Sequence, residues 1–439
     1  MSKKLERYAA IGDDYPVPQT MQALVLSGVG MDNLRLQEVR VPQCGPNQLL
    51  ARVDAVSACA SDNKVIDQGS RHSLMYGWDV SLYPVIIGHE GSVTLMKVGE
   101  NLKGKYHVGD RFAVQPAIPS GPYHYRERYV NQARGINKVA IGYTLSGLFS
   151  EYVLITEEVL DTGCLLPLPD EKIPYAGAAL AEPLSCVIAA QERIVHVVWD
   201  RGATRRQAQL GPKREGTTLI IGAGPMGLMH VEVAMSYHPE EIIVSELLPQ
   251  RLEKAKHIFS RKARELGIRL VCTHPDDLDR TIQEETDGRG VDDVIIALGI
   301  AKVQEKSLEY LARGGVTNFF GGARAGESLI QVDSRRIHYD GISVVGSSGS
   351  EPPDVARALE MIASGLIDPG NYIAKCGGLD AAISLIKAVR EQRIDGKGVI
   401  YPHTESPLID VQGWDLRKER KFLEEHLKLG RGPYFSSRF

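Results

Sequence analysis

The stretch Thr217-Thr-Leu-Ile-Ile-Gly-Ala-Gly-Pro-Met-Gly227 determines how the rest of the chain is interpreted. A short apolar run leads into a G-x-G-x-x-G motif, made by Gly222, Gly224 and Gly227, and an apolar segment follows over residues 228–235. This order predicts a strand, a tight turn and a helix, which is the context in which the motif binds a dinucleotide. Gly222 permits the turn, Gly224 lets the backbone approach a pyrophosphate, and Gly227 lets the helix pack closely on the strand.

The residues that follow this turn bear on the choice of cofactor. Pro225 and Met226 complete the predicted phosphate-binding turn, and the next apolar run ends at Glu246, 19 residues beyond Gly227. A carboxylate at that distance can accept hydrogen bonds from the adenosine ribose and would repel the 2′-phosphate of NADP. We therefore expect NAD rather than NADP, with Arg251 placed to stack on or near the adenine. The alternative, a glycine loop on an ordinary α/β turn, explains neither the spacing nor the acid.

Strands and helices continue to alternate beyond the glycine turn. Apolar runs recur at residues 270–272, 292–298, 316–320 and 342–345, with helix-like segments between them. This alternation predicts a doubly wound parallel sheet, an α/β fold of the Rossmann type. We predict that residues 181–348 form this dinucleotide-binding domain.

The first third of the chain has a different pattern. Runs at residues 21–26, 34–39 and 49–56 are short and are separated by glycine and proline. Such dense turn signals predict an irregular β-rich domain rather than a βαβ unit. We predict that residues 1–180 form this second, catalytic domain, and that residues 349–439, with a strand at 396–401, complete it.

Two segments outside this scheme have their own predictions. The basic, polar stretch 201–214 is expected to be a surface loop, because its charge needs no further function. The apolar residues from Cys186 to Val195 are expected to continue the preceding helix. The tail from His403 to Phe439 is expected to contain a charged helix within residues 408–429.

The overall composition excludes several classes of protein. The 439 residues carry a net charge of -4, from 51 basic and 55 acidic side chains, so a general nucleic-acid or membrane-surface role is not indicated. Six cysteines are scattered without a C-x-x-C pair, which argues against a disulfide scaffold and for a reducing compartment. We see no secretory signal and no apolar stretch of about 18 residues, so we expect a cytoplasmic protein.

Three short motifs carry residues suited to metal chemistry. Cys59-Ala-Ser-Asp62 follows the third run, Gly88-His-Glu-Gly91 comes about 30 residues later, and Ala181-Glu-Pro-Leu184 precedes the glycine turn. Each motif alone is more often structural, as a buried thiol, a satisfied histidine or a helix-start glutamate. Together they supply a thiolate, an imidazole and carboxylates, which are ligand types of a catalytic zinc with an open coordination position.

The order of these motifs resembles the zinc-dependent medium-chain alcohol dehydrogenases, in particular their polyol and sugar branch. The resemblance extends from about residue 21 to about residue 402 and implies a GroES-like catalytic domain. It also implies that Cys59, His89 and Glu182 are zinc ligands. Glu90 would be either a close carboxylate outside the ligand set or a ligand that exchanges with water.

The same resemblance implies a route for the substrate proton. Ser61 matches the hydroxyl that relays the proton outward, while Asp62 is expected to hold its loop by local hydrogen bonds. Lys64 stands near the position at which some relatives carry a proton-shuttling histidine, so the far end of the relay is left open.

The implied reaction is hydride transfer between NAD and a secondary alcohol or ketone of a polyol, sugar or sugar phosphate. An amino alcohol such as threonine is the nearest alternative substrate. A zinc-free reductase and a nucleotide-binding protein on the same scaffold are alternatives of other classes. Relatives of this kind are commonly homodimers or homotetramers, and we expect the same here.

The segment 115–147 departs from the family pattern. Many relatives carry four cysteines there that hold a structural zinc, and this chain has none, so we expect one catalytic zinc per chain and no structural zinc. The segment is instead rich in basic and aromatic residues, namely Tyr123, His124, Tyr125, Arg126, Arg128, Arg134 and Lys138. These residues suit either a solvated loop or oligomer contact, or a clamp for an anionic substrate.

Overall fold

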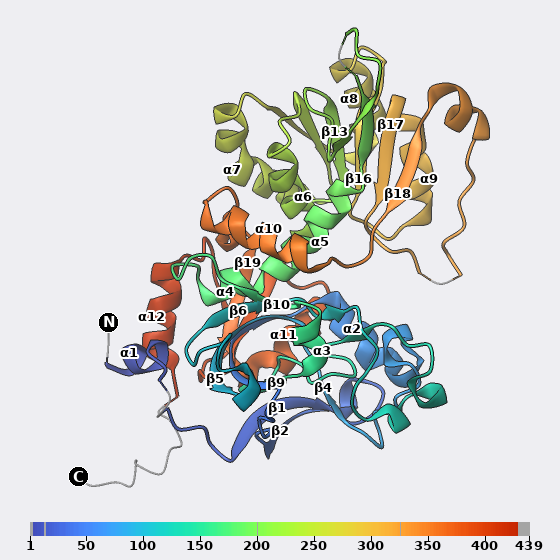
Figure 1. Cartoon of the computed structure of the whole chain (residues 1–439). Coiled ribbons are helices and arrows are strands. Elements are labelled where there is room, and N and C mark those ends of the chain that lie inside the picture. The colour runs from blue at the N-terminus through green and yellow to red at the C-terminus, as the bar shows by residue number, and fades with distance from the viewer. Residues whose placement is uncertain (1–2, 13–14, 200, 325, 429–439) are drawn as a thin grey trace. The chain divides into compact units, whose positions relative to one another are not determined.

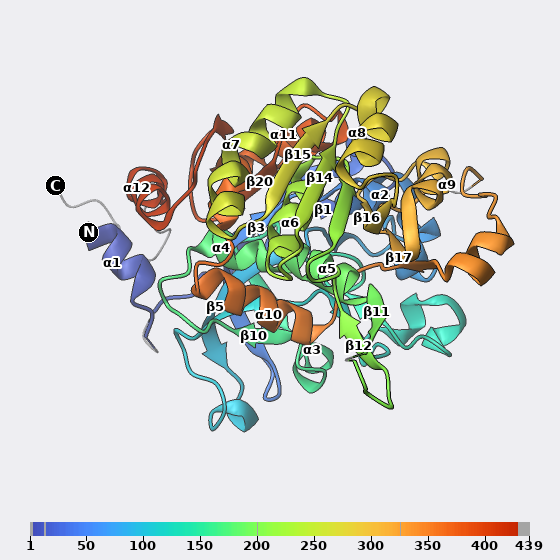
Figure 2. The ribbon, with the colours of Figure 1, turned by 90° about the horizontal axis from the view of Figure 1, so that it is seen from above.

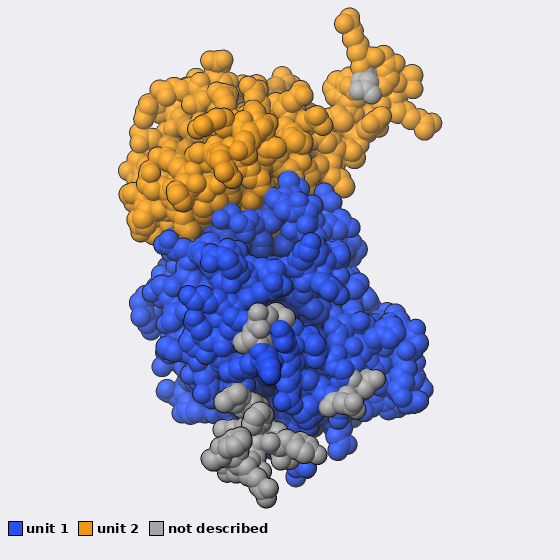
Figure 3. Space-filling view, turned by 90° about the vertical axis from the view of Figure 1, so that its left-hand side faces the viewer, with its two compact units in different colours: residues 1–182, 351–439 blue, residues 183–350 orange. Residues whose placement is uncertain are grey.

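The computed structural model describes residues 3–12, 15–199, 201–324 and 326–428 (Figure 1). The chain divides into two compact units (Figure 3). Unit 1 contains residues 1–182 and 351–439, and unit 2 contains residues 183–350. The C-terminal part of the chain therefore returns to the unit in which the chain begins.

Unit 2 is built on a six-stranded parallel sheet with the strand order β15-β14-β13-β16-β17-β18. Its strands are β13 (Thr217–Ile221), β14 (Glu241–Ser245), β15 (Arg269–Thr273), β16 (Val291–Ile296), β17 (Leu311–Phe319) and β18 (Ser343–Gly346). The strand order reverses at β13, as in doubly wound sheets that carry helices on both faces. The predicted doubly wound Rossmann fold is confirmed.

The helices of unit 2 connect and cover these strands. They are α6 (Pro225–Met235), α7 (Pro249–Glu265), α8 (Leu278–Glu285) and α9 (Ala301–Tyr310). Helices α6 and α7 pack on the β13–β15 side, and α9 packs on β16 and β17 (Figures 1 and 2). Every residue of β13, β14 and β16 is buried, as expected for parallel strands that are covered on both faces.

Unit 1 contains the irregular β-rich domain that the sequence predicted. An eight-stranded sheet has the order β10-β6-β5-β3-β20-β19-β21, with β9 paired to β3, and a three-stranded sheet has the order β2-β1-β4. The strands of unit 1 are β1 (Thr20–Leu26), β2 (Leu34–Arg40), β3 (Leu49–Ser57), β4 (Val85–Ile86), β5 (Glu90–Val98), β6 (Arg111–Val114), β7 (Ala117–Ile118), β8 (Val139–Ala140), β9 (Tyr152–Ile155), β10 (Leu165–Pro167), β19 (Ile373–Gly378), β20 (Lys397–Tyr401) and β21 (Ile409–Asp410). Strands β7 and β8 lie outside both of these sheets and pair with each other. Strand β20 pairs with β3, which joins the two ends of the chain.

Short helices surround these sheets. They are α1 (Lys3–Ala9), α2 (Ala60–Gln68), α3 (Glu157–Asp161), α4 (Tyr175–Ala179), α10 (Pro352–Ala363), α11 (Ala382–Arg390) and α12 (Leu416–His426), and α5 (Ala181–Glu192) begins at the end of unit 1. The predicted tail helix is present as α12, and residues 429–439 lie outside the described part of the chain. Among the described residues, no helix has the length and hydrophobicity needed to span a bilayer.

Two local predictions were wrong. The apolar helix does not continue to Val195, because α5 ends at Glu192 and the β-branched run that follows forms β11 (Val195–Val198). The stretch 201–214 is not all loop, because β12 (Gln207–Leu210) within it pairs antiparallel with β11. A hydrogen bond of 2.7 Å between His196 and Asp293 ties this hairpin to β16. Neither that pairing nor that hydrogen bond is visible in a local sequence pattern.

Candidate active site

Three of the predicted ligands come together in unit 1. Ligand-type atoms of Cys59, His89 and Glu90 all lie within 4.8 Å of one another, and we call these residues the ligand cluster. Cys59 immediately precedes α2, His89 immediately precedes β5, and Glu90 is the first residue of β5. His89 and Glu90 are buried and Cys59 is partly buried. The side chains thus project from the ends of two elements that meet at β3.

Backbone geometry explains the glycine before His89. Gly88 has a φ of +98°, in the region that favours glycine. A Cβ atom at this position would lie 2.5 Å from the ring of Phe149. The G-H-E sequence therefore reflects a close approach of the backbone to a core aromatic residue, which fixes where His89 emerges.

Asp62 contributes more to the site than the sequence predicted. Its Oδ2 atom accepts a hydrogen bond of 2.9 Å from the backbone N–H of Cys59, which is the predicted local contact. Its Oδ1 atom lies 3.0 Å from Nδ1 of His89. With the proton on Nδ1 donated to Asp62, Nε2 of His89 is left to bind a metal.

The charge of Asp62 also acts on His89. Burial alone would lower the pKa of His89, but the Asp62 carboxylate and, after it, Cys59 raise this pKa well above its ordinary value. The imidazole therefore lies in a strongly negative environment. A cation bound at Nε2 would experience the same attraction.

Glu90 is held by two further side chains. The hydroxyl of Ser57 donates to Oε2, and Nζ of Lys397 donates to Oε1 over 2.7 Å. Although burial favours the neutral amine, the nearby Glu90 carboxylate raises the pKa of Lys397 above its ordinary value. Lys397 begins β20, 307 residues after Glu90, and no local motif identified it. Its place follows from the pairing of Val399 in β20 with Ser57 in β3.

Glu182 lies at the edge of this arrangement. It is the second residue of α5 and is buried, but its carboxylate is not part of the group of ligand atoms within 4.8 Å. Burial, and then the charge of Glu90, raise the pKa of Glu182 to about 7. Its carboxylate is therefore close enough to the ligand cluster to sense its charges.

The segment that carries Glu182 is fixed by the C-terminal tail. Glu419 of α12 accepts hydrogen bonds of 2.8 Å from the backbone N–H groups of Tyr175 and Ala176 at the start of α4. The hydroxyl of Tyr401 donates to the same carboxylate over 2.9 Å. The tail thus provides acceptors for backbone N–H groups at the N-terminus of α4, a role that the sequence left open.

The two residues predicted for the proton route differ in environment. Ser61 is partly buried in the first turn of α2, and its hydroxyl makes no hydrogen bond to any other described residue. Lys64 lies one turn later and is exposed. Burial, and then the charge of Lys64, lower the pKa of His72, so this ammonium group lies near a histidine that the sequence did not single out.

In unit 2 the glycine turn has the predicted form. Gly222 has a φ of +100°, and a Cβ on Gly227 would lie 1.9 Å from the carbonyl oxygen of Gly222. Gly224 precedes α6, in which Pro225 and Met226 are the first two residues. The turn thus presents backbone N–H groups at a helix N-terminus, which is suited to phosphate.

Glu246 is bound to this turn. Its Oε2 atom accepts a hydrogen bond of 2.8 Å from Ala223 N–H, and Oε1 accepts one of 3.0 Å from Leu248 N–H. Nη1 of Arg251 lies 3.8 Å from Oε2 of Glu246. The carboxylate is thus fixed at the end of β14, with the guanidinium beside it.

A second group of ligand-type residues occurs in unit 1. Ligand-type atoms of His124, Glu157 and Glu158 also lie within 4.8 Å of one another, and we call these residues the loop cluster. The Arg128 guanidinium, in the same segment, lies over the ring of Tyr125 at 3.9 Å and over that of Tyr83 at 4.5 Å. Arg128 therefore packs on aromatic rings, and this favours the loop interpretation of the segment over an anion clamp.

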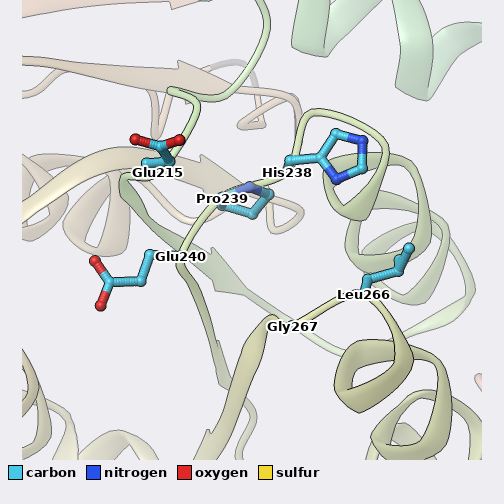
Figure 4. A pocket seen from close by; sticks show the side chains of 6 residues that line it. All are labelled: Glu215, His238, Pro239, Glu240, Leu266 and Gly267. Carbon is cyan, nitrogen blue, oxygen red and sulfur yellow. The ribbon is translucent and has the colours of Figure 1, made fainter.

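The pocket shown in Figure 4 is separate from these residues. It has a volume of about 430 Å³ and is lined by Glu215, His238, Pro239, Glu240, Leu266 and Gly267 (Figure 4). Glu215 and Glu240 precede β13 and β14, whereas the glycine turn follows β13. The pocket thus lies at the opposite edge of the sheet from the dinucleotide turn and contains none of the predicted site residues.

A Rossmann unit with a glycine turn, together with a β-rich unit bearing a Cys–His–Glu cluster, defines the class of zinc-type dehydrogenases. Comparison with known families agrees with this assignment. Residues 45–170 match the alcohol dehydrogenase GroES-like domain, and residues 225–364 match the zinc-binding dehydrogenase domain.

Individual relatives match this chain along most of their length. The chain is 30% identical over 420 residues to mannitol-1-phosphate 5-dehydrogenase from Aliivibrio fischeri, covering 93% of this chain and 92% of the relative. It is 28% identical to L-sorbose 1-phosphate reductase from Klebsiella pneumoniae, covering 83% and 84%. The fold matches the crystal structure of 2R,3R-butanediol dehydrogenase from Bacillus subtilis with a TM-score of 0.68, at 23% identity, over 87% of this chain and 99% of that one. The chain belongs to the zinc-dependent medium-chain alcohol dehydrogenase family.

Proposed function

We propose that this oxidoreductase uses NAD and one zinc ion to oxidise a secondary alcohol of a polyol or polyol phosphate, or to reduce the corresponding ketone. The observation that supports this most directly is the ligand cluster, in which Cys59, His89 and Glu90 offer sulfur, nitrogen and oxygen atoms within 4.8 Å. This mixed donor set suits zinc. Glu182 would complete it, because its carboxylate is buried and lies close enough to Glu90 for the two negative charges to interact, and a divalent cation would offset both effects.

Each residue has a distinct task in this proposal. When bound, zinc supplies a Lewis acid for the substrate oxygen and NAD supplies the hydride acceptor. Asp62 orients the ring of His89, and Ser57 and Lys397 hold Glu90. Ser61 would take the proton of the substrate hydroxyl and pass it outward, since its own hydroxyl has no other partner among the described residues. Lys64 would lie at the outer end of this route.

The preference for NAD rests on Glu246. Its carboxylate is held against the glycine turn by two backbone N–H groups, so it cannot easily move away from a ribose bound there. A 2′-phosphate would meet this negative charge. Arg251 would partly offset the repulsion. The variant Glu246→Ala, which retains Arg251, is therefore expected to use NADP better than the wild type does.

The phosphorylated substrate is suggested by relatives. Mannitol-1-phosphate 5-dehydrogenase, L-sorbose 1-phosphate reductase and D-arabitol-phosphate dehydrogenase, the last from Enterococcus avium, all carry phosphorylated substrates in their names. We propose the same substrate class here. Turnover of a polyol phosphate no better than that of the unphosphorylated polyol would contradict this part of the proposal.

We further propose a cytoplasmic homodimer or homotetramer. Edge strand β18 and the segment before it expose large apolar side chains, including Leu329, Ile337, Tyr339 and Val344. Burial of such side chains against a second copy would be favourable. Light scattering coupled to gel filtration gives the mass directly, and a monomer at micromolar concentration would contradict this proposal.

The test of the proposed function is a substrate panel assayed with NAD by absorbance of the reduced cofactor. Free and phosphorylated polyols are compared on the same metal-loaded preparation, beside threonine as the amino-alcohol control. The proposal expects turnover of polyols or their phosphates that is lost on removal of the metal by a chelator. Turnover of threonine alone, or turnover unaffected by the chelator, would contradict it.

A further inference from the structure

Tyr143 lies beside the ligand cluster, although no motif pointed to it. Its ring centroid is 5.9 Å from that of His89, with 46° between the ring planes. The residue is only 7% exposed, and its hydroxyl makes no hydrogen bond to any other described residue. A phenol is protonated at neutral pH, so the Tyr143 hydroxyl can donate a hydrogen bond. The hydroxyl is not completely enclosed by protein atoms, so a bound ligand can reach it and accept a hydrogen bond from it.

His72 packs on Tyr143 as well. Its ring centroid is 5.2 Å from that of Tyr143. Nδ1 of His72 accepts a hydrogen bond of 3.2 Å from the backbone N–H of Leu74. Because Nδ1 is the acceptor, the proton of the neutral ring must lie on Nε2, which makes His72 a donor at its other nitrogen. Burial, and then the charge of Lys64, lower the pKa of His72, which favours this neutral form.

Two neutral donors are thus adjacent at one side of the metal ligands. Neutral O–H and N–H groups are suited to hydroxyl oxygens, whereas a charged fork such as arginine is suited to phosphate. A polyol has a hydroxyl on the carbon next to the reacting carbinol, and a simple secondary alcohol has none. A site that hydrogen-bonds this adjacent hydroxyl can discriminate strongly between a polyol and a simple secondary alcohol.

We propose that Tyr143 and His72 form a hydroxyl-binding pair that recognises the hydroxyl adjacent to the reacting carbinol and so selects polyols over simple secondary alcohols. The inference rests on the proposed function, and it concerns specificity at that same site. Tyr143 would contact the substrate directly and is the principal member of the pair. His72 supplies a second donor and packs against the tyrosine ring.

The experiment compares two forms of the enzyme on two substrates, in the manner of a double-mutant cycle. Values of kcat/KM are measured for the wild type and Tyr143→Phe with a polyol and with its deoxy analogue, which lacks only the adjacent hydroxyl. Phenylalanine keeps the ring contacts with His72 and His89, so zinc content should not change. We expect the substitution to reduce kcat/KM about tenfold more for the polyol than for the deoxy analogue.

Two further variants complete the design. His72→Gln is expected to reduce the same discrimination in the same direction, mainly through a higher KM. Tyr106→Phe is the matched control, because Tyr106 is similarly buried in unit 1, at 8% exposure, but its ring packs on Phe112 away from the metal ligands. The control should leave the ratio of the two substrates unchanged.

The outcomes separate this inference from the proposed function. Equal losses on the two substrates in Tyr143→Phe, or a loss of zinc from that variant, would show a merely structural role and overturn the inference. Absence of wild-type turnover on any polyol would instead overturn the proposed function, and the inference with it.

Discussion

Among its described residues, unit 1 contains two clusters of metal-ligand side chains with similarly short distances between their ligand-type atoms. In the ligand cluster of Cys59, His89 and Glu90, and in the loop cluster of His124, Glu157 and Glu158, three ligand-type atoms lie within 4.8 Å. The clusters differ in the partners that surround them. That difference separates a candidate metal centre from a hydrogen-bonded contact.

In the ligand cluster, other side chains orient the ligands. Asp62 accepts a hydrogen bond from Nδ1–H of His89, and Lys397 and Ser57 donate to Glu90. Such outer partners set the orientation and tautomer of metal ligands. A soft thiolate donor is also present in Cys59, which favours zinc over harder cations.

In the loop cluster, the candidate ligands already serve as hydrogen-bond partners. Oε2 of Glu157 lies 3.1 Å from Nε2 of His124 and accepts a bond of 2.9 Å from Gln48. Oε1 of Glu158 accepts a bond of 2.7 Å from Tyr123 N–H. The His124 side chain is 46% exposed. We interpret this cluster as a contact that holds segment 115–147 on α3.

The largest expected effect follows from removing a ligand. His89→Ala should reduce kcat/KM by about a thousandfold or more, because several kcal/mol of transition-state stabilisation depend on the metal. Steady-state kinetics with the best substrate of the panel measure this effect. His124→Ala, assayed in parallel, should retain activity within about twofold, and comparable losses in the two variants would remove the distinction between the clusters.

Glu419 is a buried carboxylate outside both clusters, and its predicted role is structural. Glu419→Ala would leave the N–H groups of Tyr175 and Ala176 and the Tyr401 hydroxyl without their acceptor. We expect a loss of about 3 kcal/mol in the free energy of unfolding, measured by urea denaturation. Glu425→Ala, which removes an exposed carboxylate 3.8 Å from Lys421 on the same helix, is the control. A similar stability for both variants would show that the tail does not fix α4.

Asp62→Asn tests the outer partner of His89. Asparagine can still accept from Cys59 N–H, but it cannot supply the charge that favours a metal-bound imidazole. Zinc affinity, measured by competition with a chromophoric chelator, should fall about 10–100-fold. Asp67→Asn, which removes only an exposed ion pair with Arg390, should leave zinc affinity as in the wild type. An unchanged affinity in Asp62→Asn would show that His89 is oriented by other means.

The smallest effect is expected at the loop cluster and depends on pH. Burial alone would raise the pKa of Glu157, but the hydrogen bonds from Gln48 and His124 lower this pKa below its usual range. The pKa of Glu157 is therefore lower in the folded state than in the unfolded state. The ionised carboxylate stabilises the fold at pH values above the unfolded-state pKa, and this stabilisation is lost as the pH falls through the folded-state pKa. His124→Ala should therefore lower stability by no more than about 1 kcal/mol near pH 6, and the difference from wild type should shrink toward pH 3. A difference that grows on acidification would contradict this sign.

Features that depend on short stretches of neighbouring residues could be predicted from the sequence. The run into Gly222 and the later alternation predicted the Rossmann fold, because strand and helix patterns are local. Cys59, His89 and Glu90 could be named because short motifs carry them. Their meeting in one cluster followed only from the resemblance to a family.

The features that the sequence missed depend on contacts between distant segments. Lys397 reaches Glu90 through strand pairing across 307 residues. Tyr143 reaches His89 from a loop without regular structure. The β11–β12 hairpin has a β-branched first strand, but its pairing with a polar second strand gives no periodic signal. Each of these features depends on tertiary packing, which local residue propensities do not predict.

The most direct test of the account is the metal content of purified protein, measured by mass spectrometry for the wild type, Cys59→Ser and His124→Ala. We predict one zinc per chain in the wild type and in His124→Ala, and none in Cys59→Ser. Two zincs per wild-type chain, or zinc retained in Cys59→Ser, would contradict the assignment of the single metal centre to the ligand cluster.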